Sequence, residues 1–455
     1  MPVRSIRLTV VLMLMAGPSL LLAANPEHRM SYLDNGTIRI GVNLNAGGAI
    51  AYLSKSGDST NLVNNWDWGR QIQMSHYSGP VPFAPDGKQP FPQWAGLGWN
   101  PVQAGDHFRN PSKVLDHRNE GKTLYVKCIP MQYALDNVPA ECVFECWITL
   151  QGNTAEVRSR MTVDRPDKTQ YPARGQELPA IYTIGTLYRL MTYTGDKPFT
   201  GDALTRIEKS EEEKRKGGWP WVRYRATENW AALVNDQDWG VGIWEPGCTS
   251  FVGGFAGKPG KGGTNDDPTG YISPMLDEII DHNIAYEYRY VLIVGSLDEI
   301  RKHVYEHARR PVPPTYKFEK DRQHWHYRNA VDTGWPIRGE LNVLLDKPDP
   351  QLIGPSGFWL AKDAPKLRIE AAFKTGQGQA TVFWKRFDDD RFTGAKSLTF
   401  QIRPDGEYHV YEIDLSASPE YRGAITGLRL DPAEAGNKGD WVKIRSIAFD
   451  KPDAR

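Results

Sequence analysis

The sequence has no net charge, few cysteines and few long apolar segments. These shortages argue against a nucleic-acid partner, a zinc site and a membrane-spanning segment, respectively. Lysine plus arginine equals aspartate plus glutamate, 55 each, so no positive excess points to nucleic acid or an anionic membrane as partner. Beyond the first 24 residues no segment is apolar enough to cross a bilayer. The four cysteines match no zinc-binding spacing.

The first 24 residues differ in composition from the rest of the chain. Arg4 and Arg7 precede an apolar stretch over residues 8–22, and the small residues Ala23 and Ala24 follow it. Basic, apolar and small residues in this order are typical of a Sec signal peptide. We therefore expect a bacterial protein that is periplasmic or secreted, with no membrane insertion after cleavage near Ala24.

The cysteines are compatible with two states. Cys128 and Cys142 flank a turn at residues 136–139, so in a hairpin they would face each other and form a disulfide. Buried free thiols are the alternative, with Cys146 on the same face as Cys142 and Cys248 after a strand end. The spacing alone leaves both states open.

Aromatic residues, glycine and proline are abundant, with 15 Trp, 20 Tyr, 43 Gly and 33 Pro. Short strands with aromatic faces and Gly/Pro turns fit this composition better than long helices do. Several segments alternate apolar and polar residues, as half-buried antiparallel strands do. The expected strands are residues 124–132, 142–150, 155–163, 180–190, 230–234, 240–244 and 285–294. We predict an all-β, antiparallel fold.

One helix and one linker complete the expected organisation. Residues 296–307 begin with a serine cap and an acid three residues later, which predicts a short helix. The proline-rich residues 310–314 indicate a domain boundary. We expect a signal peptide over 1–24, a catalytic unit over 25–310, a linker over 311–324, and a second β-sandwich of jelly-roll type over 325–455.

Parts of the first unit resemble galactose mutarotase-like domains. The resemblance rests on residues 47–57, GGAIAYLSKSG, on Asn61-Leu62-Val63, and on the later segments 229–234, 239–243 and 286–293. It implies an antiparallel β-supersandwich over about residues 30–310. That fold hosts epimerases, lyases and accessory domains of glycosidases, so the resemblance leaves the reaction open.

Residues 381–384, 408–415 and 428–432 resemble the jelly rolls of carbohydrate-binding modules in secreted polysaccharide enzymes. The resemblance implies one structural calcium in the C-terminal unit and no other required cofactor. Asp414, Asp431 and Asp450 are available carboxylates, although their spacing does not assign them as ligands.

Two stretches, residues 64–77 and 99–107, combine tryptophans with histidines, amides, acids and an arginine. Aromatic faces suit a sugar ring, and the polar groups can fork hydrogen bonds to neighbouring hydroxyls. We therefore expect a carbohydrate substrate. The predicted substrate-binding residues are Trp66, Asp67, Arg70, Gln73, Tyr77, Trp99, Gln103 and Trp221.

Hydrolysis of a glycosidic bond needs two carboxyl groups. Asp67, Asp106, Glu177 and Glu245 lie in polar, turn-rich settings. Glu177 directly precedes a predicted strand, and Asp106 follows Gly105, whose small size permits close approach by a ligand. We predict Asp106 and Glu177 as the acid/base pair, with His76 and His107 as further catalytic residues.

Other activities remain open at this stage. Elimination on a uronate would use His76, Tyr77 or His107 as base and Arg70 to neutralise the carboxylate. A mutarotase reaction would pair His107 or His282 with Glu245 or Glu287, although the typical epimerase histidine motifs are not recognisable.

A non-catalytic glycan-binding protein would use the same tryptophans. We place glycoside hydrolysis first because of the neutral charge and the number of placed carboxylates. The sugar, any metal ligands and the oligomeric state stay open.

Overall fold

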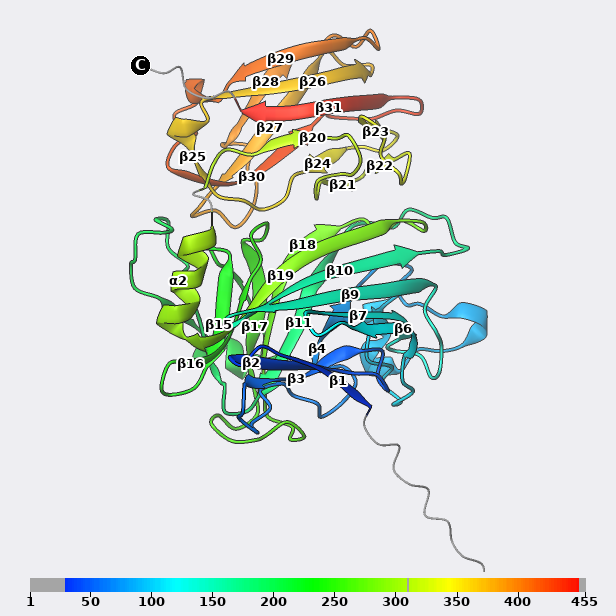
Figure 1. The fold of residues 1–455 in the computed structure, drawn as a ribbon. Coiled ribbons are helices and arrows are strands. Elements are labelled where there is room, and N and C mark those ends of the chain that lie inside the picture. Colours follow the sequence, from blue (N-terminus) through cyan, green and yellow to red (C-terminus); the bar gives the residue numbers. More distant parts are fainter. Residues whose placement is uncertain (1–28, 309–310, 450–455) are drawn as a thin grey trace, which may run out of the picture.

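The structure is a computed structural model that describes residues 29–308 and 311–449. The predicted signal peptide and Asp450 lie outside the described residues. Two pairs of antiparallel sheets follow one another along the chain, one above the other in Figure 1. We call residues 29–308 the N-terminal sandwich and residues 311–449 the C-terminal sandwich. The predicted antiparallel all-β fold is confirmed.

The first sheet of the N-terminal sandwich has the order β1-β2-β3-β4-β11-β18-β17-β14, with β5 beside β4 and β8 beside β5. Its strands are β1 (Met30–Asp34), β2 (Ile38–Asn43), β3 (Ala49–Lys55), β4 (Ile72–Ser75), β5 (Pro101–Val102), β8 (Met131–Gln132), β11 (Arg174–Ile184), β14 (Val222–Arg225), β17 (Ser250–Ala256) and β18 (Thr269–Glu278). This sheet carries the candidate site.

The second sheet has the order β13-β12-β15-β16-β19-β10-β9-β7-β6. Its strands are β6 (Lys113–Asn119), β7 (Thr123–Ile129), β9 (Cys142–Gln151), β10 (Thr154–Val163), β12 (Arg189–Thr192), β13 (Thr205–Ile207), β15 (Trp230–Val234), β16 (Trp239–Trp244) and β19 (Ala285–Ser296).

The main core of the N-terminal sandwich lies between these two sheets. Along β9 the buried residues Cys142, Phe144, Cys146 and Ile148 alternate with more exposed ones, as one buried face of an antiparallel strand requires. Residues from both sheets join them in a single cluster. Burial of these alternating faces holds the two sheets together.

All four cysteines are buried free thiols, so the disulfide alternative is wrong for this structure. Cys128 of β7 lies opposite Phe144 of β9 rather than opposite Cys142. The hairpin register is therefore two residues away from the one that a bridge to Cys142 requires.

Helices contribute little. The predicted helix is α2 (Leu297–His307), and Ser296 accepts from the Glu299 amide while Glu299 reaches back to Ser296. Its apolar face packs on β15, β16 and β19.

The charged run near residue 210 contains only α1 (Glu211–Arg215), which has no buried residue. Within residues 29–308 and 311–449, no helix is long and apolar enough to cross a membrane. Short 3-10 turns are η1 (Pro85–Gly87), η2 (Pro92–Leu97), η3 (Ala361–Asp363) and η4 (Leu415–Ala417).

The C-terminal sandwich also has two sheets, β22-β23-β31-β26-β29 with β20 beside β31, and β21-β24-β30-β27-β28 with β25 beside β30. Its strands are β20 (Thr315–Lys317), β21 (His326–Arg328), β22 (Val331–Asp332), β23 (Leu341–Leu344), β24 (Gln351–Ile353), β25 (Trp359–Leu360), β26 (Lys366–Lys374), β27 (Gln379–Arg386), β28 (Ser397–Gln401), β29 (Tyr408–Asp414), β30 (Ala424–Asp431) and β31 (Trp441–Phe449).

The C-terminal sandwich has a hydrophobic core of its own, which includes Trp325, Trp359 and Trp384. Jelly-roll connectivity and the structural calcium stay predictions. Asp431 is already paired with Arg429, and Asp414 caps the turn at Ser416.

A buried ion cluster joins the two sandwiches. Arg322 of the C-terminal sandwich donates to Asp281 of the N-terminal sandwich at 2.6 Å and to Asp332 at 2.6 Å. Gln170 of the N-terminal sandwich bridges to Asp332 at 2.6 Å. Arg322 and both aspartates are at least 90% buried, so each charge depends on its partners for solvation.

Removing Arg322 should destabilise the protein strongly. Arg322→Met leaves Asp281 and Asp332 buried without their cation, and we expect a loss of about 3–5 kcal/mol in the free energy of unfolding. Arg118→Met, which breaks the exposed pair with Asp116, should change the stability far less, because water solvates both charges. Urea unfolding of both variants measures the difference, and equal small losses would contradict the role of the cluster.

Candidate functional site

A cavity of about 600 Å³ opens beside the first sheet of the N-terminal sandwich. Strands β11 and β18 contribute Glu177, Tyr182 and Tyr271 to its lining, and Tyr77 follows β4. Three loops complete it, at residues 67–70, 93–100 and 219–221. Its volume is typical of a pocket for an organic ligand.

Glu177 is the central group of this cavity. Tyr77 Oη donates to Glu177 Oε2 at 2.7 Å, and Tyr271 Oη donates to Glu177 Oε1. Ser75 Oγ in turn donates to Tyr77 Oη at 3.1 Å. Glu177 is only 8% exposed, so these phenols replace water as its hydrogen-bond partners and fix its orientation.

The backbone aims Glu177 by means of a bulge. Glu177 lies opposite Ser75 of β4 and Met275 of β18, and both registers shift directly after it. Pro179 lies within the shifted stretch and has no N–H to give to a ladder. A bulge beside a strand pair redirects the neighbouring side chain, here into the cavity.

The tyrosines of the cavity are neutral hydrogen-bond donors. Burial, and then the charge of Glu177, raise the pKa values of Tyr182 and Tyr271 well above 10, and the same two causes raise that of Tyr77. Burial and then Asp67 raise the pKa of Tyr133. At neutral pH all four phenols keep their protons.

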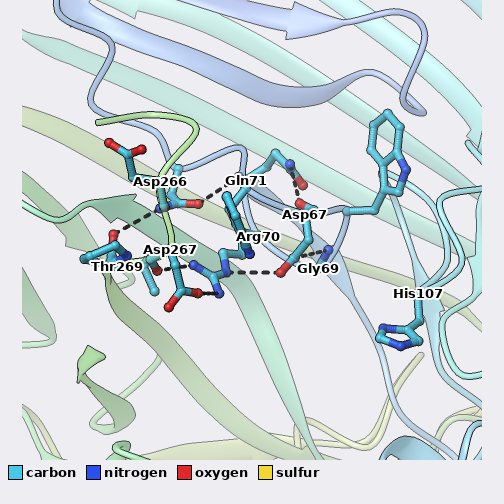
Figure 2. A network of polar contacts seen from close by, with 12 residues as sticks. Asp67, Gly69, Arg70, Gln71, His107, Asp266, Asp267 and Thr269 are labelled. Atoms are coloured by element: carbon cyan, nitrogen blue, oxygen red, sulfur yellow. Dashed lines mark hydrogen bonds and ion pairs between the residues drawn. The ribbon is translucent and has the colours of Figure 1, made fainter. Parts of the chain in front are cut away.

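A second group of polar contacts lies at the cavity wall. Arg70 Nε lies 3.2 Å from Asp67 Oδ2, and Arg70 Nη2 lies 2.8 Å from Asp267 Oδ1. Figure 2 shows Arg70 held between these two carboxylates. Its guanidinium is therefore already neutralised within the protein, with little left to pair with an anionic ligand.

Aromatic faces line the rest of the cavity. Trp94 and Trp219 stack with ring centroids 5.4 Å apart, and Trp219 is 54% exposed. Trp221 packs on Tyr271 at 4.9 Å. The exposed part of Trp219 therefore lies beside the buried polar groups of the cavity.

The structure brings five of the predicted site residues to this cavity: Asp67, Arg70, Tyr77, Glu177 and Trp221. The other seven do not line it.

Four of those seven are predicted substrate-binding residues. Gln73 and Gln103 are buried and bond to backbone groups of the neighbouring loops. Trp99 is fully buried, and its Nε1 donates to Glu141 at 2.9 Å. Trp66 is 44% exposed but lies outside the lining. The same amide and indole groups that can bond a sugar can also brace a loop, and the sequence pattern does not distinguish the two roles.

Asp106 braces a loop instead of facing the cavity. It is fully buried and accepts from the Asn110 amide, the Asn110 side chain and the Asn137 amide, each at 2.8 Å. Gly105 is small because the Asn110 carbonyl would lie 2.4 Å from any Cβ there, and not because a ligand approaches it. With three hydrogen bonds from its own loop and the neighbouring turn, Asp106 is a turn-stabilising carboxylate.

His76 is a core histidine. Its Nδ1 lies 3.2 Å from Gln176 Oε1, and the ring packs edge-on against Phe144, Tyr286 and Tyr288. Burial lowers its pKa to about 4, so the ring is neutral at neutral pH.

His107 lies in an aromatic cluster near the cavity but outside its lining. Trp94 Nε1 donates to His107 Nδ1 at 3.2 Å, and the Phe91 ring lies 4.4 Å away. In Figure 2 it is apart from the Asp67–Arg70–Asp267 contacts. It therefore positions Trp94, which does line the cavity.

The sequence-based site prediction did not include Tyr133, Tyr182, Tyr271, Trp94 or Trp219, all of which line the cavity. Tyr182 and Tyr271 lie directly opposite each other on β11 and β18, with centroids 4.7 Å apart. They are 89 residues apart in sequence, and only the strand pairing brings them together. The exposed Trp-Pro-Trp at 219–221 was the available signal.

No protein-family model matches the chain, and no curated protein matches it in sequence. Solved structures resemble it in fold. A galactose mutarotase related enzyme from Lactobacillus acidophilus is 12% identical over 59% of this chain and 97% of its own, with a TM-score of 0.34. A galactose mutarotase-like protein from Lactobacillus casei is 11% identical over 58% of this chain and 99% of its own, with a TM-score of 0.33. An alpha-galactosidase from Geobacillus stearothermophilus is 11% identical over 63% of this chain and 44% of its own, with a TM-score of 0.35.

Two of these three structures carry galactose mutarotase in their names. At TM-scores of 0.33 to 0.35 these likenesses carry no argument about fold or activity.

The buried state of His76 predicts acid sensitivity. The pKa of His76 is about 4 in the folded protein, below the ordinary value of 6.5. Between these two pH values the unfolded chain therefore binds a proton at His76 and the folded chain does not. Stability should fall as the pH drops from about 6.5 to 4, by about 3 kcal/mol from this group. His76→Asn should reduce the loss between pH 7 and pH 4.5 in urea unfolding. Identical pH profiles for the variant and the unmodified protein would contradict this.

Proposed function

We propose that this chain is a carbohydrate-active enzyme that acts at the anomeric centre of a sugar bound in the 600 Å³ cavity, and that glycoside hydrolysis is its reaction. The observation that carries the proposal is the Glu177 carboxylate, nearly buried, oriented by two tyrosine hydroxyls and exposed to the cavity alone.

Hydrolysis requires two carboxyl groups across the bound sugar. Glu177 and Asp67 are the carboxyl groups that line the cavity within the described residues. We therefore assign Asp67, in place of Asp106, as the partner of Glu177. The stacked Trp94 and Trp219 would hold the sugar ring, and Asn100 and Gln93 would bond its hydroxyls.

The charge of the cavity favours a neutral sugar. Two carboxylates line it, and Arg70 is already paired with Asp67 and Asp267. A uronate carboxylate would meet repulsion from Glu177 without a free cation to offset it. The phenols also have raised pKa values, so none is poised to be the tyrosinate base of an elimination.

Glu177→Gln should abolish turnover while leaving sugar binding. The amide keeps the shape but loses the charge, and we expect kcat to fall about a hundred- to ten-thousandfold. Reducing ends and unsaturated products are measured together on neutral and uronate-containing glycans. Glu145→Gln is the matched control, because Glu145 also accepts from a tyrosine, Tyr125, at 2.7 Å but outside the cavity.

Reducing ends without unsaturated products, lost in Glu177→Gln only, would support hydrolysis. Unsaturated products would instead show elimination, and full activity of Glu177→Gln would contradict the assignment. Glycan binding without turnover of any substrate by the unmodified protein would favour the non-catalytic alternative.

Trp219→Ala should weaken glycan binding through loss of the stacked face. We expect about a tenfold higher KM with a smaller change in kcat, since the indole would contact a ring next to the reacting bond. Trp66→Ala is the matched control, because Trp66 is similarly exposed, at 44% against 54%, yet lies outside the cavity. Equal effects of the two substitutions in steady-state kinetics would argue against the Trp219 platform.

A further inference from the structure

A second, smaller cavity lies at the junction of the two sandwiches. Its volume is about 120 Å³, well below the roughly 300–1,000 Å³ of pockets for organic ligands. The N-terminal sandwich contributes Arg223 of β14, Ser250 of β17 and Asp277 of β18. The C-terminal sandwich contributes Lys385 of β27 and His326 of β21. Its size suits a small ion.

Two cations line this cavity without a partner. Within residues 29–308 and 311–449, neither Arg223 nor Lys385 has a side-chain hydrogen bond or an ion pair. Lys385 makes only a cation–π contact with Phe392, at 5.3 Å. Burial, and then the nearby Arg225, lower the pKa of Lys385, while the charges of Asp389, Asp390 and Asp277 act in the opposite direction. Because neither side chain is hydrogen-bonded to a protein acceptor, both cations can donate to an anion that enters the cavity.

Further donors surround the same space. His326 Nδ1 is buried without a hydrogen-bond partner. The hydroxyls of Ser250 and Ser356 also line the cavity. His324 is held by Glu278, and its pKa is raised to about 9 because the Glu278 charge and hydrogen bond outweigh the cost of burial. The single lining carboxylate, Asp277, is outnumbered by these groups.

We propose that this cavity binds one oxyanion, a sulfate, phosphate or carboxylate group, through Arg223 and Lys385, and so ties the two sandwiches together. Guanidinium and ammonium groups with serine hydroxyls are the donors that such anions take. The group can belong to a free inorganic ion or to an acidic sugar whose carboxylate reaches the junction. The inference is independent of the proposed function, since none of these residues lines the larger cavity.

Calorimetric titration of the full chain tests the proposal, with phosphate, sulfate, glucuronate and glucose in a constant chloride background. We expect saturable binding of one anion per chain and none of glucose. Arg223→Gln and Lys385→Gln should each weaken binding about tenfold. The double variant Arg118→Gln/Lys122→Gln removes two exposed charges elsewhere and should bind as the unmodified chain does.

Tighter binding of glucuronate than of phosphate or sulfate would identify an acidic sugar as the source, and the reverse order a free ion. Absence of saturable binding of any anion would overturn the proposal. Equal affinities in the unmodified chain, Arg223→Gln and Lys385→Gln would do the same. Because Arg223 is exposed and makes no hydrogen bond, Arg223→Gln should fold even where Lys385→Gln does not, and its thermal unfolding confirms this before titration.

Discussion

The candidate site depends on one constraint: a carboxylate taken out of water must be given hydrogen-bond donors from the protein. Glu177 meets this with two phenols, one from a loop after β4 and one from β18. Those donors are in place only because β4, β11 and β18 lie side by side and the bulge after Glu177 turns its side chain toward them. The sheet order is thus a condition for the chemistry.

Glu177 differs from the other buried carboxylates of the N-terminal sandwich in what surrounds it. Glu228 is fully buried and accepts from Arg301, Tyr305 and Trp230, and these contacts anchor α2. Asp106 is likewise enclosed, by backbone and amide donors of its loop. In both cases the donors surround the carboxylate. Glu177 differs because its donors lie on two sides and a cavity lies on the third, which leaves room for a reacting group.

Much of the fold was predictable from the sequence because strand alternation is local. Residues 142–150 and 285–294 alternate clearly, and the structure has strands there. Glu177 was expected just ahead of a strand that begins at residue 180, whereas the structure places it within β11, at the bulge, so its position in the cavity was found on a ground that was partly wrong. Tyr271 was not, since its role arises from pairing with a strand far away in sequence. Asp106 and Trp99 have the side chains that a sugar site needs, but both are buried and stabilise loops instead. Burial depends on the tertiary structure, so the local sequence does not reveal it.

The two cavities are linked through shared strands. On β18, Tyr271 belongs to the larger cavity and Asp277 to the smaller, about 20 Å apart along an extended strand. Trp221 and Arg223 are closer still, two residues apart at the start of β14, which is the edge of the first sheet. An edge strand is paired on one side only, so its position relies on what its side chains contact. An anion bound to Arg223, as proposed, would therefore also hold the strand next to Trp221, and Lys385 would bring the C-terminal sandwich into the same contact.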